Sequence, residues 1–182
     1  MEKINAMKRI REEFKELEIC HKINSNPIAN IGVCVGLVNE DNIFEWRCTL
    51  KGPNDTSYRG GIFYLRINFP ENYPNAAPEV TFRTPIYHLN VNPRNTSTER
   101  LGHVCINTLN WWKPEYKMKE VLTNIFALFY MANPQSPYGP EKAKEFLENR
   151  ALYEQKVQFF TKKYANPNSN FQYTGQDWDL SY

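Results

Sequence analysis

Apolar residues recur at helical spacing near the start of the chain. Within residues 2–18 they stand three or four positions apart, with charged residues between them. This spacing predicts an amphipathic first helix that buries one face. The apolar positions are Ile4, Met7, Ile10, Phe14 and Leu17.

Strict alternation replaces the helical spacing in the next part of the chain. In "IFEWRCTLK" (43–51) and "IFYLRINF" (62–69), apolar and polar residues alternate, as in strands that bury one face. A third strand-like segment precedes them, and "EVTFR" (79–83) follows as a fourth. The connections "NEDN" and "GPNDTSYRGG" carry turn residues. The pattern predicts a four-stranded antiparallel meander with one face exposed to water.

Helical spacing returns in the last part of the chain. "KEVLTNIFALFYMA" (119–132) predicts a largely buried helix, and "PEKAKEFLEN" (140–149) and "ALYEQKVQFFTKKYA" (151–165) predict two more. The order of elements predicts an α+β fold, with the C-terminal helices packed on one face of the sheet. We expect one domain over residues 1–165 and a flexible tail over 166–182, because the tail is polar and aperiodic.

Composition narrows the class of protein. Lysine and arginine total 22 against 20 acidic residues, a net charge of +2, so we expect no nucleic-acid partner. No apolar run is long enough to cross a bilayer and no signal peptide is apparent, which predicts a soluble protein without a membrane partner, in the cytoplasm, the nucleus or both. The four cysteines form no C-x-x-C pair, so we expect free thiols, no metal site and no cofactor.

One stretch concentrates candidate chemistry. "IYHLNVNPRNTSTERLGHVCIN" (86–107) holds two of the three histidines and Cys105. A cysteine nucleophile needs a raised thiolate fraction, and the only basic residue close to Cys105 in sequence is His103. A Cys105–His103 pair, as in cysteine hydrolases, is therefore one possible interpretation. The other interpretation treats His103 as an exposed loop residue.

Several motifs occur together in an order typical of one family. The string "GPNDTSYRGGIFYLRINFPENYPNAAPEVTFRTPIYHLNVN" is followed by "GHVCINTL", "WWKP" and "NPQSP". Over roughly residues 3–165 the chain resembles the catalytic domain of ubiquitin-conjugating enzymes. The resemblance implies that Cys105 accepts ubiquitin, or a related modifier, as a thioester from an activating enzyme. It also implies transfer of the modifier to a lysine of a protein substrate, usually with a ligase.

The resemblance assigns two further site residues. Asn90 matches the asparagine of the family's His-Pro-Asn triplet, which implies that it stabilises the oxyanion directly or supports the active-site loop. The alternative interpretation is purely structural: Asn90 is a turn residue whose side chain bonds to local backbone. Ser136 matches a gate position that helps to present the incoming lysine, and otherwise it is an ordinary turn serine. We take Cys105, Asn90 and Ser136 as the candidate catalytic residues.

Two departures from the family pattern affect this site. Leu89 replaces the proline of the triplet, which frees a backbone N–H that needs a partner and predicts a looser loop. About seven extra residues within "PRNTSTERL" put Asn90 15 positions before Cys105. The segment must therefore fold back if Asn90 is to reach the thioester.

The resemblance also implies partner surfaces. The first helix, with Lys8 and Arg9, matches the surface that meets the activating enzyme. Two loops match those that meet RING or HECT ligases, and their candidate contacts are Asn75, Trp112, Pro114 and Tyr116.

The sequence leaves two questions open: which modifier the protein carries, and whether the protein is catalytic. "WWKP", "NRALYEQKVQ" and Asn107 resemble enzymes of neddylation, whereas "GPNDTSYRGG" and the first helix resemble enzymes of ubiquitin. We favour ubiquitin. A non-catalytic variant of the fold, acting as a binding module, is the alternative from another functional class; such variants typically lack the cysteine.

Overall fold

The protein has an α+β fold in a computed structural model that describes residues 1–22, 32–95, 100–168, 176 and 178. The helices are α1 (Glu2–Lys22), α3 (Asn107–Asn110), α4 (Met118–Ala127), α5 (Pro140–Glu148) and α6 (Arg150–Tyr164). The strands are β1 (Val33–Leu37), β2 (Glu45–Lys51), β3 (Ile62–Asn68) and β4 (Glu79–Phe82). The predicted fold class is confirmed.

The four strands form one antiparallel sheet in the order β1-β2-β3-β4, as the alternation predicts. Trp46 pairs with Ile67 and Cys48 with Leu65, and all four are buried. Their neighbours on the other face are more exposed, with Tyr64 at 56%. The predicted inward and outward positions of β2 and β3 are therefore confirmed.

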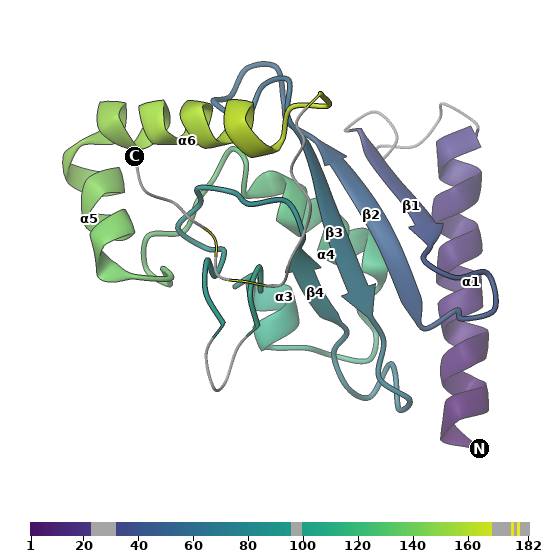
Figure 1. Cartoon of the computed structure of the whole chain (residues 1–182). Helices are drawn as coiled ribbons and strands as arrows, with labels where there is room; N and C mark the ends of the chain where they lie inside the picture. The colour runs from purple at the N-terminus through teal and green to yellow at the C-terminus, as the bar shows by residue number, and fades with distance from the viewer. Residues whose placement is uncertain (23–31, 96–99, 169–175, 177, 179–182) are drawn as a thin grey trace.

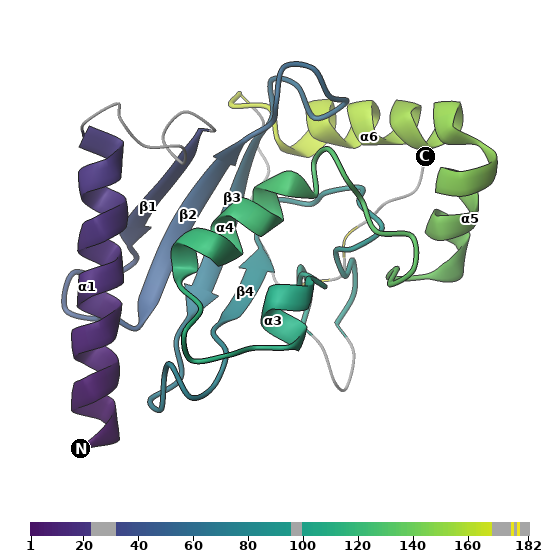
Figure 2. The same ribbon diagram turned by 180° about the vertical axis from the view of Figure 1, so that it is seen from behind.

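The helices lie along one edge, across one face and beyond one end of this sheet. Helix α1 runs along the edge formed by β1, and α4 crosses the buried face (Figures 1 and 2). Helices α5 and α6 lie beyond the end at which β3 begins, where the Ile62 N–H donates to the Ala165 carbonyl (2.8 Å). Among the described helices, none is both long and apolar enough to cross a membrane.

A buried carboxylate joins α1 to the rest of the core. Glu13 is 3% exposed, and it accepts hydrogen bonds from the Tyr73 hydroxyl (2.8 Å) and the Met118 N–H (2.6 Å). Arg9, one turn earlier, forms an ion pair with Glu13 and donates to the Tyr116 carbonyl (3.0 Å). A buried carboxylate is tolerated only when its oxygens are satisfied in this way. The contacts fix α1 against the start of α4 and the loop before it.

The segments on either side of the extra residues before Cys105 pair with each other. Val91 and Val104 form an antiparallel bridge, and the Asn92 N–H donates to the His103 carbonyl (2.9 Å). The Gly102 N–H in turn donates to the Asn92 carbonyl (2.7 Å). We call these paired segments, 90–92 and 102–105, the arms of the insert. Because the arms pair, a separation of 15 positions along the chain becomes a contact in space.

The second arm also extends the sheet. The Phe82 N–H donates to the Gly102 carbonyl (2.8 Å), and Thr81 bridges His103. The second arm is therefore anchored to β4 as well as to the first arm.

Most of the predicted tail lies outside the described residues. Trp178 is one of the described tail residues, and it is 8% exposed. Its backbone N–H donates to the Pro93 carbonyl (3.0 Å).

The position of Gly102 makes a testable prediction about stability. Its φ is +78°, and an added Cβ would lie 2.0 Å from the Phe82 carbonyl oxygen. We expect Gly102→Ala to combine left-handed backbone strain, about 1–2 kcal/mol, with a clash against β4, and to lower the free energy of unfolding by roughly 4 kcal/mol in all.

Gly60→Ala is the matched control in urea denaturation. Gly60 has nearly the same φ, +80°, but nothing lies within 4 Å of its added Cβ, so we expect only the backbone strain there. An equal decrease in the free energy of unfolding in the two variants would contradict the close packing of the second arm against β4.

Candidate active site

Cys105 lies between the second arm of the insert and α3, and its side chain is half-buried. Its Sγ is 3.1 Å from the Ser136 hydroxyl oxygen, and the Asn110 side-chain amide donates to it (3.3 Å). The backbone N–H of Cys105 donates to the Asn90 carbonyl (2.9 Å). The structure thus brings all three predicted site residues together.

The sulfur opens into a groove of about 270 Å³. The groove is bounded by residues 105–108, by α4 and by the loop from Met131 to Ser136. None of the side chains that line it carries a charge. A flexible acyl donor can therefore reach the sulfur, and the surroundings of the sulfur are neutral.

Asn90 is completely buried, and each of its polar groups has a partner. Its Nδ2 donates to the carbonyls of Asn133 and Ser136 (2.8 Å each), and its Oδ1 accepts from the Asn133 N–H (2.7 Å). These partners are more than 40 positions away, so the local turn interpretation does not describe this side chain. Asn90 fixes the loop that carries Ser136.

His88 orders the backbone beneath Asn90. Its Nδ1 accepts from the Asn90 N–H (2.9 Å), so its Nε2 carries the proton and donates to the Leu128 carbonyl (3.1 Å). The ring is 1% exposed, and this burial lowers the pKa of His88 to about 4. His88 is therefore neutral at physiological pH and ties the site to the end of α4.

Leu89 is anchored although it replaces a proline. Its side chain is fully buried, and its backbone N–H, which a proline would lack, donates to the Tyr153 hydroxyl oxygen (3.2 Å). Its carbonyl accepts from the Tyr138 N–H (2.6 Å). The expected partner for the freed N–H is thus present, and hydrogen bonds on both sides hold the loop at Leu89.

His103 does not contact Cys105 through any hydrogen bond in the described part of the chain. Its Nδ1 is 2.7 Å from the Tyr138 hydroxyl, and the two rings meet edge to face. The pairing needed for a hydrolase, with a histidine bonded to the nucleophile, is not formed. The site instead surrounds the sulfur with a hydroxyl and an amide.

The predicted ligase contacts lie on two adjacent loops. The Trp112 indole N–H donates to the Pro74 carbonyl (2.6 Å), next to Asn75, and its ring packs edge to face on Tyr116. Asn75 and Pro114 are exposed. The two residues predicted to meet the activating enzyme differ in their surroundings. Lys8 is exposed, whereas Arg9 pairs with Glu13 and donates to the Tyr116 carbonyl.

Sequence reasoning missed Asn110, Asn133 and Trp111. Asn110 contacts the sulfur and Asn133 exchanges two hydrogen bonds with Asn90. Trp111 is 76% exposed beside the predicted ligase loop. The one available signal was the position of Asn110, five residues after Cys105.

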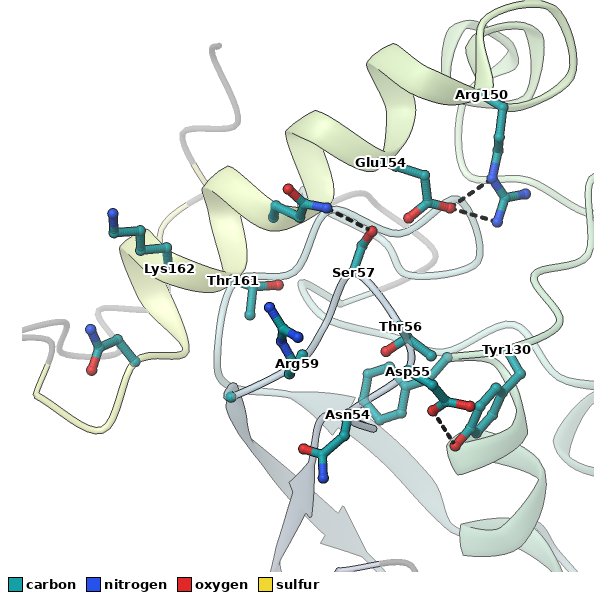
Figure 3. A pocket seen from close by; sticks show the side chains of 14 residues that line it. Asn54, Asp55, Thr56, Ser57, Arg59, Tyr130, Arg150, Glu154, Thr161 and Lys162 are labelled. Atoms are coloured by element: carbon teal, nitrogen blue, oxygen red, sulfur yellow. Dashed lines mark hydrogen bonds and ion pairs between the residues drawn. The ribbon is translucent and has the colours of Figure 1, made fainter.

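A larger hollow, of about 960 Å³, lies elsewhere, between the loop that joins β2 to β3 and helix α6 (Figure 3). Figure 3 shows Arg59 reaching toward α6, where Arg150 pairs with Glu154. None of the predicted site residues lines this hollow. We place the candidate site in the smaller groove, because of the two cavities only that groove is lined by a cysteine thiol.

The described residues hold no group of three or more His, Cys, Asp or Glu side chains that could bind a metal ion. Cys34, Cys48 and Cys105 are free thiols. The side chain of Cys20 lies outside the described residues.

The buried neutral His88 predicts a pH-dependent stability. The unfolded chain has a histidine pKa near 6.5, whereas the folded pKa is about 4. Between these values the unfolded state binds the proton and the folded state does not, so stability falls as the pH falls through this window. We expect a loss of roughly 3 kcal/mol between about pH 7 and pH 4 from this group.

Urea denaturation at several pH values, on the protein and on His88→Gln, measures this loss. The variant lacks the titrating ring, so its stability profile should be flatter over the same window. Parallel profiles would contradict the neutral, buried state of His88.

Comparison with known proteins gives the family. The sequence pattern of the family described as "Ubiquitin-conjugating enzyme" matches residues 9–161. The chain is also 36% identical, over 162 residues, to a protein of Arabidopsis thaliana named "Probable ubiquitin-conjugating enzyme E2 31". That alignment covers 88% of this chain and 94% of the relative. With the fold and the cysteine groove described above, these matches show that the chain belongs to the ubiquitin-conjugating enzyme family.

Proposed function

We propose that this protein accepts ubiquitin from an activating enzyme as a thioester on Cys105 and transfers it to a lysine, usually with a ligase. The observation that carries the proposal is the placement of the Cys105 sulfur at an open, uncharged groove, in contact with Ser136 and Asn110. A binding module of the same fold would need neither the nucleophile nor its contacts.

The first step is a thioester exchange. The Cys105 thiolate attacks the carbonyl carbon of the modifier's C-terminal thioester on the activating enzyme. A new S–C bond forms, and the thiolate of the activating enzyme leaves. The groove suits this step because a narrow, flexible C-terminal peptide can reach the sulfur there.

The second step forms an amide. The lone pair of the lysine amine attacks the same carbonyl carbon, and its π electrons move to the oxygen. Collapse of this tetrahedral oxyanion breaks the S–C bond, releases Cys105 as thiolate, and the amine loses its proton to solvent. The distance of 3.1 Å between the Ser136 hydroxyl oxygen and the sulfur supports the proposed gate role, in which Ser136 contacts the approaching lysine.

For Asn90 the contacts support one of its two proposed roles. Both of its amide hydrogens are directed at the carbonyls of Asn133 and Ser136, and the side chain is completely buried. A direct oxyanion donor would have to give up one of these bonds during the reaction. We therefore propose that Asn90 acts on transfer through the position of the loop that carries Ser136.

The partner surfaces are part of the same proposal. Lys8 on the exposed face of α1 suits a contact with the activating enzyme. Asn75, Trp112, Pro114 and Tyr116 suit a ligase, and exposed Trp111 adds an aromatic anchor beside them, since large aromatic residues commonly contribute most at interfaces. Ubiquitin is the favoured modifier because the family and the relative both carry its name; a neddylating activity is the alternative.

The charging assay tests the nucleophile. With activating enzyme, ATP and ubiquitin, we expect an adduct that thiol reagents remove on a gel. Cys105→Ala should form none, and Cys105→Ser should form an ester that resists thiol. Cys34→Ser, which changes a free thiol on the sheet, is the matched control and should charge normally.

Other outcomes of this assay would overturn the proposal. No adduct with ubiquitin but one with the neddylating modifier and its activating enzyme would change the substrate. No adduct with either would favour the binding module, and cleavage of conjugates without ATP would favour a hydrolase.

The role of Asn90 gives a second prediction. We expect Asn90→Ala to charge but to discharge to free lysine about 10²-fold more slowly. Since three buried hydrogen bonds are lost, the free energy of unfolding should also fall by roughly 3 kcal/mol. Slow discharge with unchanged stability would instead indicate direct oxyanion donation, and unchanged discharge would remove Asn90 from the transfer step.

A further inference from the structure

The sulfur of Cys105 has two neutral hydrogen-bond partners and no charged one among the residues that line its groove. A thiolate needs stabilisation by cations, a helix dipole or hydrogen-bond donors. The groove offers no cation, and His103 is bonded to Tyr138. Within the described groove, a negatively charged sulfur can therefore be stabilised only by hydrogen-bond donors.

Of the two partners, only Asn110 is an obligate donor. The Ser136 hydroxyl can donate to the sulfur or accept from it, whereas the Asn110 Nδ2 can only donate. Its contact distance of 3.3 Å is short for a donor to sulfur. The amide therefore interacts more favourably with the thiolate than with the thiol.

The backbone around α3 holds Asn110 in this position. The Asn110 N–H donates to the Ile106 carbonyl (3.0 Å), and the Trp111 N–H donates to the Asn107 carbonyl (2.8 Å). Leu109, next to Asn110, is buried and anchors the turn in the core. The amide is thus presented to the sulfur by a fixed turn, although its side chain is exposed.

We propose that Asn110 is a catalytic residue that stabilises the Cys105 thiolate through its side-chain amide. The amide acts on the sulfur whenever the sulfur carries negative charge. In charging, that is the thiolate which attacks the carbonyl carbon and forms the S–C bond. In transfer, it is the thiolate which leaves when the S–C bond breaks and the amide bond to lysine forms.

This assignment divides the work between two asparagines. Asn90 is buried and its two amide hydrogens are occupied by backbone carbonyls, so it supports the loop. Asn110 is exposed and its amide contacts the reacting atom. The role of Asn110 in charging and transfer rests on the proposed function, but its effect on the thiolate does not.

The test follows alkylation of Cys105 by iodoacetamide as a function of pH, on the full chain without any modifier. Mass spectrometry of the peptide that contains Cys105 separates it from the other cysteines. For Asn110→Ala we expect the alkylation profile to move to higher pH by roughly half a unit to one unit, because a charge-assisted hydrogen bond is lost. Asn110→Asp should move it further, because it places a carboxylate beside the sulfur.

Asn107→Ala is the matched control. Asn107 is an exposed asparagine of the same short helix that lines the same groove, and its described contacts include no side-chain bond to the sulfur. We expect its alkylation profile to coincide with that of the unchanged protein. Thermal unfolding of each variant identifies any loss of folding, and Asn110→Gln, which keeps a donor, should recover part of the shift.

Charging and discharge assays complete the test. Asn110→Ala should charge about three- to tenfold more slowly at neutral pH and approach the unchanged rate at higher pH. A folded Asn110→Ala with an unchanged alkylation profile, or the same shift in Asn107→Ala, would overturn the assignment. Failure of the unchanged protein to form any thioester would overturn the proposed function instead, and would leave the alkylation result intact.

Discussion

The buried amide of Asn90 is the constraint on which the geometry of the site depends. Its three side-chain hydrogen bonds reach the loop of Asn133 and Ser136, and its carbonyl accepts from the Cys105 N–H. One residue thus sets the distance between the nucleophile and the hydroxyl beside it. Because an unsatisfied amide is costly in the interior, the loop, the arm and the core are stable only in this mutual arrangement.

Charge is used differently in the two halves of the molecule. At the end near α1, buried Glu13 joins Arg9, Tyr73 and Met118 through ionic and polar contacts. Around Cys105 the groove has no charged lining, so the nucleophile is surrounded by neutral donors. In the proposed transfer, such a neutral site neither repels nor retains a lysine by charge, so we expect substrate choice to depend on the proposed partner surfaces.

The sequence pattern predicted what depends on local order. Alternation in β2 and β3 marked the buried positions, because one-sided burial leaves a period of two, and the motifs around Cys105 indicated it as the candidate nucleophile. The partners of Asn90 and the contact from Asn110 were not predictable in the same way. They depend on where segments more than 40 positions apart, or a short turn such as α3, come to lie once the core has packed. The bonds of the His88 ring to Leu128 and Asn90 likewise depend on how the core packs.

The pairing of Val91 with Val104 lies between the extra residues and Cys105 along the chain. The second arm is fixed to β4 and the two arms are fixed to each other, so described contacts hold the chain on both sides of the extra residues. A substitution among the extra residues is therefore separated from Cys105 by a paired stretch of backbone, and this pairing keeps the sulfur in position.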